Sequence, residues 1–184
     1  KQMKKRFTSE VSIIDFQPYL PSKRKQVTLS PRNKSQKEYL KKLQDESNSI
    51  VFAIGPAGTG KTMLAVQNGI KLFQEGKIEK IVVTRPAVSV DEDLGFLPGT
   101  LEEKMAPWTR PIFDVFSEYY QKKDITRYLE EGVIEISPLA YMRGRTFKNA
   151  YIVADEMQNA TVSQMKMLLT RIGEGSQMVV TGDL

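Results

Sequence analysis

The sequence predicts an α/β fold with a mainly parallel sheet and helices on both faces of that sheet. Three observations support this prediction. Short apolar segments alternate with segments of helical period, which is typical of strands buried on both faces. A glycine-rich loop joins the first apolar segment to a helix, and an acidic pair ends a later apolar segment. In such folds, ligands bind at the carboxyl ends of the strands.

Each element is predicted from its own local pattern. Strands are read from short apolar runs, and helices from apolar residues on one face. The predicted strands are residues 50–54, 81–84, 133–136, 150–154 and 178–181. The predicted helices are residues 36–46, 62–74, 101–120 (around Pro107 and Pro111), 125–131 and 161–172. Residues 85–100 and 137–149 are predicted to be loops.

Composition excludes several kinds of chemistry. The 184 residues are enough for one domain with a sizeable core, and they include no Cys and no His. Thiol nucleophiles, disulfides, zinc–cysteine sites and histidine acid–base catalysis are therefore excluded. No apolar run reaches the roughly 18 residues of a membrane span. We expect a cytoplasmic protein that does not contact a membrane.

The net charge of +5 is unevenly distributed. Residues 1–34 carry nine basic and two acidic groups, a net charge of +7, whereas residues 35–184 carry 18 basic and 20 acidic groups, a net charge of −2. We therefore divide the chain into a basic N-terminal arm, 1–34, with one short strand near residues 11–16, and a domain, 35–184. The arm suits an anionic partner such as nucleic acid, and a solvated tail explains its composition equally well.

One segment fits the phosphate-binding pattern G-x-x-x-x-G-K-[ST] in full. Its glycines let the backbone N–H groups approach a triphosphate, and the following helix presents its positive end to the phosphates. Lys61 is expected to face the β- and γ-phosphates, and the Thr62 hydroxyl to ligate Mg²⁺. ATP and Mg²⁺ are the predicted cofactors. The cradle consists of Gly55, Pro56, Ala57, Gly58, Thr59, Gly60, Lys61 and Thr62.

Two carboxylates follow the predicted strand at residues 150–154. Asp155 is expected to hold Mg²⁺ through its water shell, and Glu156 to orient and polarise the attacking water. With Lys61, they form the predicted catalytic set. The segment Thr181-Gly182-Asp183 ends another strand, and it is a candidate polar sensor of the γ-phosphate.

Together these segments resemble the PhoH family, a branch of P-loop ATPases similar to superfamily-one helicases. The resemblance covers about residues 30–184. It implies a RecA-like P-loop NTPase fold, ATP hydrolysis, association with RNA or single-stranded DNA, and a homo-oligomeric ring such as a hexamer. Many family members continue past Thr-Gly-Asp into further motifs, so we expect the domain to be truncated after Leu184. Besides the cradle, the resemblance rests on residues 84–88, 94–99, 103–105, 143–147, 155–159, 164–166, 169–173 and 181–183.

Other side chains have both a functional and a structural interpretation. Gln36 precedes the first strand, where helicase-like ATPases read adenine, but it is also a plausible exposed helix residue. Arg85 ends a strand and is a candidate contact to phosphate or nucleic acid. Arg143 and Arg145 are expected in a loop at the same edge of the sheet, where they either grip a nucleic-acid backbone or are solvated. The aromatic residues Trp108, Phe113 and Phe116 are expected in the core rather than as base-stacking platforms.

Phosphoryl transfer usually needs a further cation on the γ-phosphate, often an arginine from a neighbouring subunit. The local motifs contain no basic residue other than Lys61 that must play this part. We therefore expect Arg171 or Arg145 to be supplied by a neighbouring copy, and a monomer to turn over slowly. Arg171 ends a helix, where a cation is also favourable by itself.

The sequence leaves three functions open. The first is an ATPase that couples hydrolysis to nucleic-acid binding or remodelling. The second is a nucleotide-gated binding module with little turnover, and the third is a small-molecule kinase, which the Asp-Glu pair disfavours. A guanine-specific switch is not expected, because the chain lacks an Asn-Lys-x-Asp run.

Overall fold

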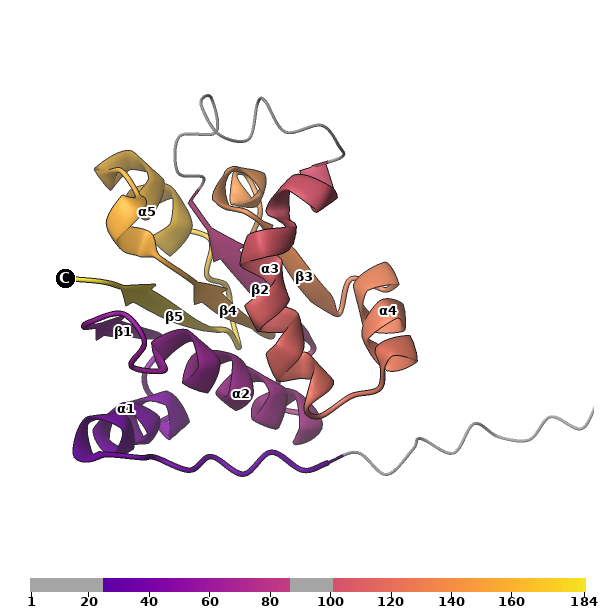
Figure 1. Ribbon diagram of the computed structural model, residues 1–184. Coiled ribbons are helices and arrows are strands. Elements are labelled where there is room, and N and C mark those ends of the chain that lie inside the picture. Colours follow the sequence, from indigo (N-terminus) through magenta and orange to yellow (C-terminus); the bar gives the residue numbers. More distant parts are fainter. Residues whose placement is uncertain (1–24, 87–100) are drawn as a thin grey trace, which may run out of the picture.

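A computed structural model describes residues 25–86 and 101–184, and the side chains of residues 101–106 are not described. It contains a five-stranded sheet in the order β1-β5-β4-β2-β3, in which all neighbouring strands are parallel (Figure 1). The predicted fold class is confirmed. The strands are β1 (Ile50–Ile54), β2 (Lys80–Arg85), β3 (Ile134–Pro138), β4 (Ala150–Ala154) and β5 (Gln177–Gly182).

Helices lie on both faces of the sheet, as predicted (Figure 1). The predicted helices are all present, with ends that differ by a few residues, and α3 includes Pro107 and Pro111. The prediction missed a short 3₁₀ helix, η1 (Leu139–Met142), inside the predicted loop 137–149. The helices are α1 (Lys34–Gln44), α2 (Lys61–Gln74), α3 (Leu101–Ser117), α4 (Lys122–Glu130), η2 (Met157–Asn159) and α5 (Val162–Leu169).

Alternate residues of each central strand enter two separate cores. In β2, Ile81 and Val83 pack with α1–α4, whereas Val82 packs on the opposite face with η1, η2 and α5. In β4, Tyr151 and Val153 face the first core, and Ile152 faces the second. These side chains are fully buried, which explains why the central strands appear in the sequence as continuous apolar runs.

The strand β1 leads into the glycine-rich loop and lies at the edge of the sheet. It pairs only with β5 among the described strands. Phe52 and Ile54 lie on the same face of the sheet as α5, but α5 does not cover them. Their exposed fractions are 55% and 53%. The loop is therefore attached to the sheet along one side only.

The helix α2 lies close to the centre of the sheet. Gly69 makes this approach possible, because a Cβ atom there would lie 2.6 Å from the ring of Tyr151 in β4. Asn68 donates to the buried Tyr151 hydroxyl at 3.3 Å. The middle of α2 is thereby fixed relative to β4, the strand that the acidic pair follows.

The described part of the N-terminal segment packs along α2. Val27 is buried, and its N–H donates to the side-chain oxygen of Gln74, whose amide in turn donates to the Lys25 carbonyl. The expected strand at residues 11–16 lies outside the described residues, as does most of the predicted loop 85–100, including the motif at 94–99.

Candidate nucleotide site

The glycine-rich loop curves between β1 and α2. Gly58 and Gly60 have φ values of 72° and 82°, a backbone conformation that glycine adopts without a steric penalty. The N–H of Gly55 donates to the Gly182 carbonyl at 3.2 Å, which fixes the start of the loop to the end of β5. The loop therefore presents its backbone and the first turn of α2 toward the carboxyl edge of the sheet.

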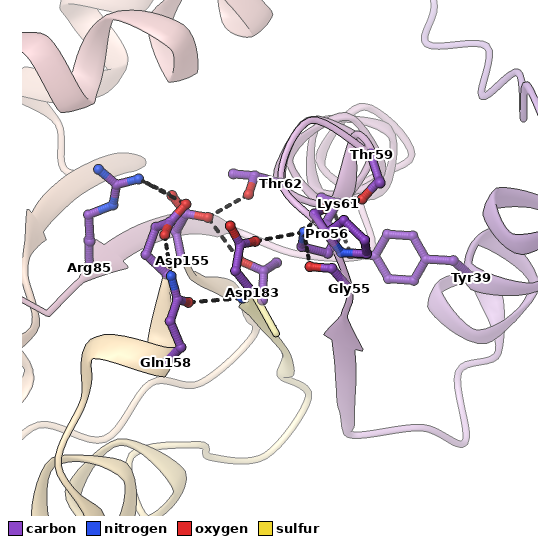
Figure 2. A network of polar contacts seen from close by, with 12 residues as sticks. Tyr39, Gly55, Pro56, Thr59, Lys61, Thr62, Arg85, Asp155, Gln158 and Asp183 are labelled. Atoms are coloured by element: carbon purple, nitrogen blue, oxygen red, sulfur yellow. Dashed lines mark hydrogen bonds and ion pairs between the residues drawn. The ribbon is translucent and has the colours of Figure 1, made fainter.

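Lys61 turns its ammonium group back into the loop (Figure 2). Its Nζ lies 2.8 Å from the Gly55 carbonyl oxygen, 2.7 Å from that of Pro56 and 2.9 Å from a carboxylate oxygen of Asp183. The side chain is only 13% exposed. An anion entering the loop therefore meets a positive charge that is paired with one carboxylate.

Asp155 follows β4 and is 5% exposed. Its Oδ1 accepts from the hydroxyl groups of Thr62 at 2.5 Å and Thr181 at 2.8 Å (Figure 2). Among the described residues, no cluster of three or more metal-binding carboxylates exists. The adjacent Thr62 and Asp155 oxygens nevertheless fit Mg²⁺, which commonly takes one or two protein ligands and completes its shell with phosphate and water.

Glu156 has a left-handed backbone conformation with φ 54° and ψ 39°. One of its carboxylate oxygens lies 3.4 Å from Nη2 of Arg85, and the other accepts from the Gln158 amide at 2.5 Å. Gln158 also accepts from the Asp183 N–H at 3.0 Å. Gln158 and Asp183 therefore connect Glu156 to Lys61 in one polar network.

The side chains of Lys61, Thr62, Asp155, Glu156 and Asp183 line one cavity of about 460 Å³. One wall consists of the glycine-rich loop and the carboxyl ends of the strands, and the opposite wall is the apolar side of α3, including Trp108 and Pro111. Arg85 lies between these walls, 5.6 Å from the Trp108 ring centroid and 3.2 Å from Asp155. Phe116 is fully buried in the core, as expected. Sequence reasoning did not foresee that Trp108 and Arg85 meet at this cavity.

Gln36 lies on the other side of the loop, in a second groove of about 520 Å³ between α1 and β1. Its amide nitrogen donates to the Thr59 carbonyl at 3.0 Å, and its amide oxygen accepts from the Arg32 N–H at 2.7 Å. The Tyr39 hydroxyl donates to the Lys61 carbonyl at 3.1 Å. Helix α1 therefore supports the loop from outside.

The expectation that Arg145 lies at the carboxyl edge of the sheet is wrong. Arg145 forms a bidentate pair with Glu135, with distances of 2.5 and 2.8 Å, and Glu135 also binds Lys80 at the start of β2. The Arg145 contact lowers the pKa of Glu135 to about 2. Arg171 donates to the Met167 carbonyl and the Thr170 hydroxyl at the end of α5. Neither arginine lines the cavity within this chain.

With this geometry established, comparison with known proteins gives the family. A family model described as "PhoH-like protein" matches residues 28–184. The chain belongs to the PhoH-like family. It is 52% identical over 149 residues to a PhoH-like protein of Bacillus subtilis (strain 168) and 50% identical over 157 residues to one of Mycobacterium tuberculosis (strain ATCC 25618 / H37Rv). It is 45% identical over 161 residues to Protein PhoH of Escherichia coli (strain K12).

These matches cover 81%, 85% and 83% of this chain but 46%, 44% and 43% of the respective relatives. The chain thus spans less than half the length of these PhoH proteins. A solved structure, the Sulfolobus solfataricus SWI2/SNF2 ATPase core in complex with dsDNA, covers 89% of this chain at a TM-score of 0.50 and 16% identity, with 34% of that structure's chain matched. This similarity concerns the fold only, and it agrees with a P-loop NTPase fold. No helix in the described ranges is long and apolar enough to cross a bilayer.

The position of Lys61 gives a first prediction. Replacing Lys61 with Ala removes the cation in the loop and should reduce ATP binding at least tenfold, while thermal unfolding still shows a folded protein. Titration of a fluorescent ATP analogue measures the affinity. Lys71→Ala is the matched control, because Lys71 lies on the same helix and pairs with Glu75 at the surface. A folded Lys61→Ala variant that binds ATP like the control would contradict the assignment.

Proposed function

We propose that this PhoH-like chain binds Mg-ATP in the glycine-rich loop, hydrolyses it, and couples hydrolysis to RNA or single-stranded DNA. One observation carries the ATPase part of the proposal. Lys61, Thr62, Asp155 and Glu156 come from two distant segments, and they line a single cavity at the carboxyl edge of the sheet.

Binding begins with an exchange of partners at Lys61. The triphosphate takes the place of Asp183 at the ammonium group and receives hydrogen bonds from the N–H groups of the loop and the first turn of α2. Asp183 is 29% exposed, so its carboxylate can move into solvent at low cost. Thr62 and Asp155 would hold Mg²⁺, which, when bound, neutralises charge on the phosphate oxygens.

Glu156 is the proposed base that orients the attacking water. It is partly exposed to the cavity, and Gln158 and Arg85 hold its two oxygens in place. A carboxylate directed at water beside the γ-phosphate site favours hydrolysis over transfer to another acceptor. The kinase alternative is therefore less well supported than the ATPase.

Arg85 is the proposed cation for the developing charge on the γ-phosphate. It lines the cavity in the same chain, and its guanidinium pairs with Asp155 and Glu156. Mg²⁺ would compete with the guanidinium for those carboxylates, and phosphate would compete with them for the guanidinium, so Arg85 can turn toward phosphate. Arg85 thus offers a source of the cation within one chain. Assembly into a ring, with Arg171 from a neighbour, stays a prediction.

Gln36 is the proposed reader of adenine. Its amide lies in the groove beside the loop. The amide oxygen and the amide nitrogen each form one hydrogen bond with a backbone group, so each can form one more. A glutamine amide can form two hydrogen bonds with the edge of adenine, a pairing that guanine does not offer. The groove also contains Tyr39 and Phe52, whose rings provide apolar contact area for a base.

The second prediction concerns Glu156. Replacing Glu156 with Gln keeps the shape of the side chain but removes the charge that polarises water, so hydrolysis should slow about 10²–10⁴-fold while Mg-ATP still binds. Phosphate release, measured with and without single-stranded RNA and DNA, tests both halves of the proposal. Unchanged turnover in this variant would exclude Glu156 from catalysis. Negligible turnover of the unmodified chain, with or without nucleic acid, would favour the gated binding module.

The third prediction concerns Arg85. Arg85→Ala should lower kcat by about 10²–10³-fold, the usual cost of one lost group that stabilises transition-state charge. Arg110→Ala, at an exposed position on α3, is the control. Activity measured across a dilution series separates the two sources of the cation. Turnover that rises with protein concentration and is insensitive to Arg85→Ala would favour an arginine from a neighbouring copy.

The fourth prediction concerns Gln36. Gln36→Ala should weaken ATP binding about 5- to 150-fold, corresponding to 1–3 kcal/mol of base discrimination, and leave GTP binding unchanged. Competition of each nucleotide against a fluorescent analogue measures both affinities, with Gln44→Ala on the same helix as the control. An equal loss for both nucleotides would show that Gln36 only supports the loop.

A further inference from the structure

The layer that covers the α5 face of the sheet, from η1 to the end of α5, contains more basic than acidic residues. Its residues 139–149 and 157–173 contain no Asp or Glu, and Asp155 and Glu156 belong to the nucleotide site. On the opposite face, α4 includes Asp124 and Glu130, whereas α1 contains one Glu and four Lys residues and α2 contains no acidic residue. A surface of one charge sign attracts a partner of the opposite sign. The basic residues of the layer are Arg143, Arg145, Lys148, Lys166 and Arg171.

Most of these cations are available to a partner. Arg145 is neutralised by Glu135 and is therefore set aside. Arg143, Lys148 and Lys166 have exposed side chains, and none of them forms an ion pair with a carboxylate in the part of the chain that the structure describes.

A groove of about 330 Å³ lies between η1 and α5 beside Arg143. Leu139, Ala140 and Met167 give it an apolar part, and Ser163 and Gln164 contribute polar groups. Thr161 caps α5 by accepting from the Gln164 N–H. Val162 and Ser163 lie in the first turn of α5, so no carbonyl of the helix lies one turn before them. Their N–H groups are therefore available to an anion at the start of the helix.

An exposed aromatic ring belongs to the same turn, η1, two residues before Arg143. In η1, Leu139 and Met142 are 1% and 0% exposed and anchor the turn in the core, whereas Tyr141 is 55% exposed. Three-residue periodicity in a 3₁₀ helix places the two anchors on the same side and Tyr141 outside. Exposed aromatic rings beside cations are the usual platforms on which unpaired bases stack.

We propose that the η1–α5 surface, defined as Tyr141, Arg143, Ser163 and Lys166, binds a single strand of nucleic acid. Arg143 and Lys166 contact phosphates, Ser163 contributes its hydroxyl and N–H, and Tyr141 stacks on a base. This inference rests on the proposed coupling of ATP hydrolysis to nucleic acid, and it specifies where the strand lies. Thr161, the cap of α5, follows Glu156 by five residues, so only η2 separates this surface from the proposed base along the chain.

The test uses fluorescein-labelled single strands of oligo(U) and oligo(dT) with the full chain, measured by fluorescence anisotropy over a range of salt concentrations. The double variant Arg143→Glu/Lys166→Glu should weaken binding at least tenfold. It should also flatten the log–log salt slope by about 1.4, since each phosphate contact contributes about 0.7 on single strands. The control Lys37→Glu/Lys41→Glu makes the same charge change on α1, on the opposite face, and should have a smaller effect.

Tyr141 gives an independent measurement. Tyr141→Ala should weaken binding about 5- to 150-fold without changing the salt slope. Tyr141→Phe should bind the strand as tightly as the unmodified chain does, because stacking needs the ring and not the hydroxyl. Basal ATP hydrolysis should be unchanged in all these variants.

Three outcomes would overturn the proposal in different ways. If the unmodified chain binds no single strand, the nucleic-acid part of the proposed function fails as well. If it binds strands and the η1–α5 variants bind equally well, or only the α1 control weakens binding, this surface is the wrong one. If an unlabelled duplex competes as well as a single strand, base stacking on Tyr141 is excluded.

Discussion

The buried carboxylate of Asp155 holds the nucleotide site together. It accepts hydrogen bonds from Thr62 at the start of α2 and from Thr181 in β5, and it pairs with Arg85 at the end of β2. Four elements that are distant in sequence therefore meet at one side chain that is 5% exposed. A buried charge is stable only when such partners surround it, so the positions of these elements depend on one another.

A second consequence of this arrangement is that each of these charged side chains has a partner of opposite sign within the chain. Lys61 is paired with Asp183, and Arg85 with Asp155 and Glu156, while Gln158 links the two groups. A ligand that carries both phosphate and a divalent cation can replace both sets of partners at once. Phosphate alone would leave the displaced carboxylates close together without a counter-charge. Under the proposed function, this pairing is a reason to expect the metal–nucleotide complex to bind better than either component.

The fold, and the meeting of Lys61, Thr62, Asp155 and Glu156 at one edge of the sheet, were predictable because they depend on local patterns. Apolar runs identified the strands, and the full loop motif with Asp155 and Glu156 identified the edge where the site lies. The neighbours of a side chain across the sheet were not predictable. Arg85 reaches the cavity because β2 lies beside β4. Arg145 lies away from the cavity because it pairs with Glu135, near the start of β3 and therefore at the opposite edge of the sheet. The 3₁₀ turn η1 was missed because four residues carry too little periodicity.

The left-handed backbone at Glu156 lowers the stability of the fold at the residue that is proposed as the catalytic base. A non-glycine residue in this conformation costs on the order of 1–3 kcal/mol, a cost that glycine would avoid. The position therefore retains a side chain that its backbone disfavours, and the rest of the domain must be stable enough to tolerate it. Glycine at position 156 would relieve this strain and yield a more stable protein that lacks the acidic group.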